Sequence, residues 1–375
     1  MPQITLTRRF HAVGQGLFCS EVVESPSINF RHTTVYDCGT TSNPTILQQE
    51  IKGLANTLDY KKIDILFLSH LHKDHISGIE QLMNECYVKK VVLPQLEPFQ
   101  IIRAYLSKSS NAPSFSDQYD DSAFALIDRV FASRDRHGDT DYVEVPAFVE
   151  PLFSSKLSNI EGNNELYNPN ALSQYKNLIL GDYTFPISLP TEEALIKYIP
   201  FNIESPQKTI FNILADQYFP DLYAQLQQGD FTQLQDEKLQ ELTKLYLHIF
   251  RGLNESSMPV LSHVIPQIPR PLDCLYTGDY THKTDKNVEK LKAFYNDEWD
   301  KIAYIQVPHH GSRYDNPVEL YQGGSHECIV SYGIPNRYNH PHQKAIDAIT
   351  KNVQNTLYQI NDKAATFSKI DSFNI

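Results

Sequence analysis

Short apolar runs that end in polar residues or glycine recur at both ends of the chain and predict β-strands. These runs are Cys19–Val23, Thr34–Gly39, Ile63–Leu68, Tyr87–Leu93, Asp273–Tyr280, Ile302–Val307 and Cys328–Ser331, together with Phe10–Phe18, which the glycine-rich turn Val13–Gly16 breaks. Apolar residues at helical spacing predict helices at residues 44–58, from near Ser77, at Val288–Tyr295 and at roughly His342–Val353. Several strands stop at a polar loop, which is where α/β proteins collect their functional side chains.

The pattern changes between about residue 95 and residue 250. Ser107–Ser122 is rich in serine and aspartate, and Glu161–Asn170 in asparagine and glycine, so both predict exposed loops. Helical periodicity returns at Thr209–Tyr218 and Thr232–Phe250. We interpret residues 95–250 as an insertion or cap region that covers the mouth of a site or contacts a protein partner. Residues 1–94 and 251–375 would then form the main domain.

Composition and charge limit the classes of function. The chain has 375 residues, 41% of them hydrophobic, which is enough for one large domain with insertions or for two domains. A formal net charge of −12 would repel nucleic acid and anionic membranes at long range. It does not exclude a phosphodiester substrate, because bound cations and local arginines dominate the field within a site.

The N-terminal sequence and the spacing of the cysteines predict the cellular compartment. The first ten residues lack the apolar core of a signal peptide, and no apolar run has membrane-spanning length. We therefore expect a cytoplasmic protein without membrane contact. The five cysteines are scattered and show no C-x-x-C spacing, which favours buried, reduced thiols.

The densest chemistry lies in the stretch Ser69–His75, directly after the strand predicted at Ile63–Leu68. It contains His70, His72, Asp74 and His75 within six residues. Side chains two apart in an extended segment point the same way, so His70 and His72 can hold one cation. Asp74 and His75 leave in another direction, where a second cation can bind, and their side chains suit zinc, manganese or iron. A histidine-rich surface loop is the alternative, and three histidines with an aspartate in this order argue against it.

Two later strands end in comparable loops. The first contains Thr277-Gly278-Asp279 and the second His309-His310-Gly311-Ser312, and Asn339-His340-Pro341 follows them. Thr-Gly-Asp alone is typical of any turn. Together with the motif at His70–His75, the loops form a strong signal for one metal centre.

The pattern H-x-H-x-D-H resembles that of the metallo-β-lactamase-fold hydrolases. This resemblance implies an α/β fold, a four-layer αββα sandwich with one or two metals at its edge, here with a large, partly helical insertion. The wider series is similar to the hydrolase domain of the ComEC/Rec2 competence proteins and covers residues 10–94 and 251–350. Its further members are Val13–Gly16, Asn254-x-Ser256-Ser257, Thr277–Asp279, His309–Ser312 and Asn336–Pro341.

The resemblance also implies roles for the residues that match. Two divalent metal ions, zinc or manganese, would bind, the first to His70 and His72 and the second to Asp74 and His75. Asp279 would bridge them. One of His309 and His310 would complete the second site while the other faces the substrate, and the sequence does not say which.

The remaining candidates concern catalysis and substrate. Asp74 would orient the nucleophile, and His340 would contact phosphate or act as general acid, unless it caps the C-terminal helix. We expect four substrate-binding residues: Arg313, Arg337, Asn254 and Ser312. Asp37 would orient a ligand histidine or cap a turn.

Two departures from the family pattern concern the first metal and the substrate. No histidine between the motif and Asp279 has the expected glycine-rich context, although His137, His248 and His263 lie there. The first metal site is therefore expected to be weak, open or completed by water. Ala12 stands where the family has aspartate, which affects substrate details more than the fold.

These observations predict a metal-dependent hydrolase that uses metal-bound hydroxide, first of all a phosphodiesterase or nuclease acting on nucleic acid or nucleotides. A hydrolase of carboxylic esters, thioesters or lactams is the first alternative, because the same metal site suits it. A non-catalytic regulatory subunit that acts through residues 95–250 is the second.

Overall fold

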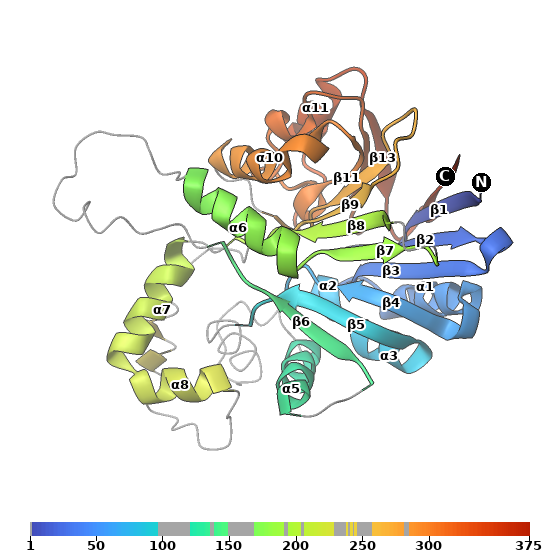
Figure 1. The fold of residues 1–375 in the computed structure, drawn as a ribbon. Coiled ribbons are helices and arrows are strands. Elements are labelled where there is room, and N and C mark those ends of the chain that lie inside the picture. Colours follow the sequence, from blue (N-terminus) through green and yellow to red (C-terminus); the bar gives the residue numbers. More distant parts are fainter. Residues whose placement is uncertain are drawn as a thin grey trace.

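The protein consists of two β-sheets packed face to face, with helices on both outer surfaces (Figure 1). The computed structural model describes residues 2–96, 121–135, 139–148, 169–190, 194–203, 206–228, 238, 241–242, 244–245, 257–280 and 285–375. Tyr36 of one sheet stacks on Tyr276 of the other, with ring centroids 5.1 Å apart. The predicted four-layer αββα sandwich is therefore confirmed.

The first sheet has seven strands in the order β14-β1-β2-β3-β4-β5-β6. The pairs from β14 to β3 are antiparallel, and those from β3 to β6 are parallel. The strands are β1 (Gln3–Phe10), β2 (Phe18–Ser25), β3 (Phe30–Cys38), β4 (Lys62–Phe67), β5 (Tyr87–Pro94), β6 (Asp141–Val145) and β14 (Phe367–Asn374).

The second sheet has the order β13-β12-β11-β10-β9-β8-β7. It is parallel from β13 to β10 and antiparallel from β10 to β7. The strands are β7 (Phe185–Ser188), β8 (Ala194–Pro200), β9 (Val260–Val264), β10 (Asp273–Tyr276), β11 (Ile302–Gln306), β12 (Glu327–Ser331) and β13 (Thr356–Ile360). Each sheet thus has a parallel half, and functional side chains are expected at the carboxyl ends of such strands.

Helices cover the outer face of each sheet. In Figure 1, α1 (Pro44–Thr57), α3 (Ile79–Glu85) and α5 (Asp121–Asp135) lie under the first sheet. On the far side of the second sheet lie α6 (Pro169–Asp182), α10 (Asp285–Trp299) and α11 (Gln343–Thr350). Two further helices, α7 (Pro206–Tyr218) and α8 (Pro220–Gln228), share a hydrophobic cluster with α1 and α5.

Helix α1 shows how local sequence produces these layers. The side chain of Asn43 accepts a hydrogen bond from the backbone N–H of Thr45, and Pro44 stands in the first turn, so the helix begins there. Leu47, Ile51 and Leu54 recur on one face and are buried against the sheet.

A charged network crosses the interior between the sheets. Glu21 accepts hydrogen bonds from Arg8 Nε (2.7 Å), Tyr198 (2.6 Å), Ser262 (2.8 Å) and Tyr276 (3.2 Å). Burial alone would raise the pKa of Glu21, but Arg8, Tyr198 and Ser262 hold it below its usual value. A buried ion pair of this kind is tolerated because almost every polar atom has a partner.

Three strands from the interval 95–250 belong to the two sheets. β6 pairs with β5, and β7 and β8 extend the second sheet from β9. The division into a main domain and an insertion at residues 95–250 remains a proposal.

The helix predicted at Thr209–Tyr218 is confirmed as part of α7. Most of Thr232–Phe250 lies outside the described residues, as do residues 107–120 and 161–168 of the two predicted loops. Residues 121–122 and 169–170, at the ends of those predicted loops, are helical instead. Across the described ranges, each helix is too short or too polar to span a bilayer.

Candidate metal centre

The motif at His70–His75 lies at the carboxyl end of β4. The backbone of His72 is extended, and the short helix α2 (Lys73–Ile76) begins directly after it. His70 and His72 therefore come from the extended part, whereas Asp74 and His75 come from the first turn of a helix. This change of backbone gives the two pairs different directions, as the sequence predicted.

Glycines in two neighbouring loops allow the motif to pack closely. A Cβ on Gly39 would lie 2.5 Å from backbone atoms of His75, and a Cβ on Gly16 would lie 2.2 Å from the carbonyl oxygen of Gly39. The backbone N–H of Leu17 also donates to the carbonyl of Asp74 (3.0 Å). The early Gly-x-Gly turn and the end of β3 therefore support the motif from below.

Asp279, which follows β10, is shared by two groups of possible metal ligands. One group contains Asp74, His75, Asp279 and His310, and the other contains His70, His72 and Asp279. Within each group, the ligand atoms lie within 4.8 Å of one another. The structure thus brings together residues from three loops, the first of which lies more than 200 positions before the other two in sequence.

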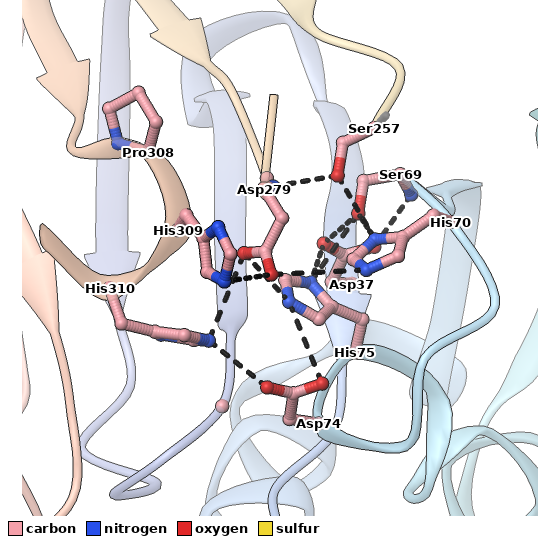
Figure 2. A network of polar contacts seen from close by, with 12 residues as sticks. Asp37, Ser69, His70, Asp74, His75, Ser257, Asp279, Pro308, His309 and His310 are labelled. Carbon is pink, nitrogen blue, oxygen red and sulfur yellow. Dashed lines mark hydrogen bonds and ion pairs between the residues drawn. The ribbon is translucent and has the colours of Figure 1, made fainter. Parts of the chain in front are cut away.

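The two carboxylate oxygens of Asp279 face different groups. Oδ1 lies 3.2 Å from His75 Nε2 and 3.8 Å from His310 Nε2. Oδ2 lies 4.0 Å from His70 Nε2 and 3.6 Å from His309 Nε2. Figure 2 shows the carboxylate of Asp279 between these rings. This arrangement fits the bridging role expected for Asp279.

The adjacent residues His309 and His310 both point towards Asp279. Their φ angles are 49° and 53°, in the left-handed region, which costs roughly 1 kcal/mol or more for each residue. Alternation along an extended segment, on which the sequence prediction relied, therefore does not apply here. The structure places His310 with the second group, where its Nε2 lies 3.1 Å from Asp74 Oδ2, and His309 beside the other oxygen of Asp279.

Asp37, at the end of β3, orients His75 from behind. Its Oδ2 lies 2.8 Å from His75 Nδ1 and accepts a hydrogen bond from Ser69 Oγ (2.7 Å), and its Oδ1 accepts one from the Ser69 backbone (2.7 Å). A carboxylate at Nδ1 directs the Nε2 lone pair of the imidazole towards a metal. Asp37 therefore occupies the orienting position that was one of its two predicted roles.

The other histidines are held in the same way. His310 Nδ1 donates to the carbonyl of Ser331 (2.9 Å), and His309 Nδ1 lies 2.8 Å from Asp315 Oδ2. The hydroxyl of Ser257 lies 3.0 Å from His70 Nδ1. In each ring Nδ1 is occupied, so Nε2 is the nitrogen left for the centre.

Buried polar atoms test whether these residues suit a cation. Among the described residues, no hydrogen-bond partner satisfies Nε2 of His70, Nε2 of His75 or Oδ1 of Asp279. The contact of 3.2 Å between His75 and Asp279 is an ion-pair distance without hydrogen-bond geometry. Unsatisfied buried groups are costly, and a divalent cation accepts imidazole and carboxylate ligands of this kind. The residues therefore fit a metal.

The electrostatics favour positive charge at the centre. Burial alone would raise the pKa of Asp279, but His309, His75 and His310 hold it well below its usual range. Burial likewise opposes ionisation of Asp74, yet His75 and His310 lower its pKa to about 2. Against burial, the carboxylates of Asp279, Asp74 and Asp37 raise the pKa of His75 well above its ordinary value. The carboxylates thus stay ionised and attract cations.

His340 lies beside the two-histidine loop. Its ring centroid is 5.7 Å from that of His309 and 6.4 Å from that of His310. Burial and then the nearby His310 and His309 lower its pKa to about 3. The N-cap of α11 is His342, whose Nδ1 accepts a hydrogen bond from the backbone of Lys344, so the capping alternative for His340 is wrong.

The predicted substrate-binding residues separate into three cases. Arg313 and Arg337 are exposed and lie over neighbouring tyrosine rings, at 5.4 and 5.0 Å from the centroids. Ser312 is buried and donates to Asp315, so it lies behind His309. Asn254 lies outside the described residues.

Of the three histidines that the sequence offered for the first metal, only His263 is described. It lies on β9 with Nδ1 2.6 Å from Asp273 and belongs to neither ligand group. His137 and His248 fall outside the described ranges. Sequence reasoning missed Asp315 and Ser331, which orient the late histidines, because neither belongs to a motif.

Comparison with known protein families gives a match to part of the chain. A family model described as anti-Pycsar protein Apyc1 matches residues 29–108, which include the motif at His70–His75 and end before Asp279. No significant match to a curated protein was found.

Twenty chains of solved structures match. One is the chemotaxis sensor ODP in a peroxy diiron species, with 13% identity, a TM-score of 0.23, and coverage of 53% of this chain and 49% of that chain. The Rm3 metallo-beta-lactamase has 9% identity, a TM-score of 0.29, and coverage of 80% and 76%. Metallo-beta-lactamase SMB-1 bound to 2-mercaptoethanesulfonate has 8% identity, a TM-score of 0.29, and coverage of 80% and 78%.

Proposed function

We propose that the protein is a metal-dependent phosphodiesterase that binds two divalent cations, zinc or manganese. The observation that carries the proposal is Asp279, whose two oxygens face two separate groups of histidine and aspartate ligands. One group would hold the first cation with His70 and His72. The other would hold the second with Asp74, His75 and His310.

When bound, such cations lower the pKa of a coordinated water towards neutrality and neutralise charge on a phosphoryl group. The protein's own residues add orientation. Asp74 is 18% exposed at its side chain and remains a carboxylate, so it can accept a hydrogen bond from the attacking water. The ring of His340 lies at the edge of the centre, and as a neutral imidazole it would donate one N–H to the substrate.

Two arginines that lie close in sequence to the ligand loops favour a phosphodiester over a carboxylic ester. Arg313 follows the two-histidine loop directly, and Arg337 precedes His340 by three residues. Both guanidinium groups are exposed, so both can leave their tyrosines for a phosphate oxygen. The similarity to ComEC-like hydrolase domains points the same way. The match to the anti-Pycsar family model supports the half of the site that contains the motif.

A substrate panel tests the proposal. The protein, reconstituted with Zn²⁺ or Mn²⁺, is incubated with single-stranded and duplex DNA, RNA, cyclic nucleotides and bis(p-nitrophenyl) phosphate. A second set contains a carboxylic ester, a thioester and a β-lactam. We expect hydrolysis in the first set, lost in His70→Ala and Asp279→Asn. It should be retained in His32→Gln, because His32 belongs to neither ligand group. Hydrolysis confined to the second set would overturn the proposal.

A further inference from the structure

We propose that His309 is a ligand of the first metal and replaces the third histidine that the sequence lacks between the motif and Asp279. The pair His309-His310 would then be divided, one imidazole for each cation. This inference rests on the proposed metal centre and adds a ligand to it.

The positions of the two rings about Asp279 carry the inference. His310 Nε2 lies 3.8 Å from Oδ1, the oxygen that also faces His75. His309 Nε2 lies 3.6 Å from Oδ2, the oxygen that also faces His70. His309 and His70 therefore lie on the same side of Asp279, and both would face a cation held by Oδ2. Figure 2 shows the two late histidines approaching Asp279 separately.

The hydrogen bonding of His309 is that of a metal ligand. Its Nδ1 lies 2.8 Å from Asp315 Oδ2, and Asp315 is itself fixed by Ser312, whose hydroxyl donates at 2.5 Å. Both supporting residues are buried. The same carboxylate–imidazole arrangement holds His75 through Asp37, with the same distance of 2.8 Å. The buried carboxylate fixes the tautomer and ring direction of His309 and leaves its Nε2 free to bind a metal.

The backbone adds an independent observation. Both members of the pair have left-handed φ angles, although neither is glycine. Strain of this kind persists where the surrounding structure requires it, and it clusters at functional sites. Here the strained turn is what brings both rings to Asp279, which a regular extended segment would prevent.

His309 also differs from a fully enclosed ligand. Its side chain is 18% exposed, whereas that of His310 is 3% exposed. Its Nε2 is not among the atoms that lie within 4.8 Å of both His70 and His72. The first site is therefore more open than the second, and we expect His309 to approach the other two histidines when the cation binds.

Crossed variants test the assignment by metal binding rather than by turnover. His75→Ala weakens the second site. In this background, equilibrium dialysis with Co²⁺ or Zn²⁺ measures the affinity of the first site. Adding His309→Ala should lower that affinity at least about 10-fold, and adding His310→Ala should leave it within about 2-fold. In a His72→Ala background, which keeps the second site, the same dialysis measures the affinity of that site. There His310→Ala should lower the affinity, and His309→Ala should leave it nearly unchanged.

A milder variant guards against misfolding. Asp315→Asn keeps the ring of His309 and removes its orienting carboxylate, so the first-site affinity should fall about 10-fold in the His75→Ala background. The visible spectrum of Co²⁺ should change with it. Unchanged first-site affinity in both His309→Ala and Asp315→Asn would overturn the inference. If the crossed pattern is found but no phosphodiester is cleaved, the ligand assignment stands and the proposed function fails.

Discussion

Asp37→Asn is the substitution that most sharply separates the two halves of the metal centre. The carboxylate is fully buried and contacts the second ligand group directly, through His75. It reaches the first group only through Ser69, whose hydroxyl donates to Asp37 and lies 3.0 Å from His70 Nδ1. In the variant, one oxygen can still accept the hydrogen bond from the Ser69 backbone. The other becomes an amide NH₂, which donates where the carboxylate accepted from His75 Nδ1. His75 must then place its proton on Nε2, the nitrogen that would bind the metal.

The expected magnitude follows from this change of tautomer. Loss of an orienting group behind a metal ligand typically lowers metal affinity 10- to 100-fold, or about 1.4 to 2.7 kcal/mol. Stability of the metal-free protein should change less. Burial raises the pKa of Asp37 despite His75 and Ser69, so the ionised carboxylate is costly to hold, and the neutral amide removes part of that cost.

The assay is a Zn²⁺ titration against a competing chelator. Wild-type protein should show two sites, and Asp37→Asn should weaken the site that contains His75 clearly more than the other. Glu50→Gln is the matched control, because Glu50 holds His11 Nδ1 at the same distance of 2.8 Å, outside both ligand groups. Two sites of wild-type affinity in Asp37→Asn, or equal weakening of both, would refute the reasoning.

Three further outcomes are expected. Arg8→Met should lower the free energy of unfolding by about 3–5 kcal/mol in urea denaturation, because it leaves Glu21 buried and uncompensated, and the double variant with Glu21→Gln should recover most of this loss. Burial lowers the pKa of His32 from its ordinary value of 6.5 to about 4. The contribution of the neutral ring to the free energy of unfolding is therefore present above pH 6.5 and lost as the pH falls towards 4. His32→Gln should therefore reduce the pH dependence of stability in this window by up to about 3 kcal/mol, and an unchanged slope would contradict this. Gly39→Ala should weaken Zn²⁺ binding and lower the melting temperature, because its Cβ would displace the backbone of His75; wild-type values for both would argue against this packing.

The parts of the fold that the sequence predicted are those with strong local patterns. β4, β5 and β11 are short apolar runs with clear ends, and α1 has both a cap and an apolar face. By contrast, β14 has a partner at the other end of the chain, with Gln3 paired to Asn374. β6, β7 and β8 lie in an interval of mixed composition, and only pairing with distant strands identifies them.

The candidate site divides in the same way. The motif residues could be named because their spacing within one loop already restricts where the side chains point. The roles of His309 and His310 could not be separated, because they depend on left-handed backbone at both positions. The role of Asp315 could not be predicted from the sequence, because it arises only when the turn brings Asp315 to His309.

The count of metal ions per chain tests the central claim most directly. Purified protein is loaded with Zn²⁺ or Mn²⁺, dialysed and measured by elemental analysis, alongside Asp279→Asn. We predict two ions per chain for the wild type and weakened retention of both in the variant, because one carboxylate serves both ligand groups. A wild-type chain that retains no metal, or a variant that retains two, would contradict the account.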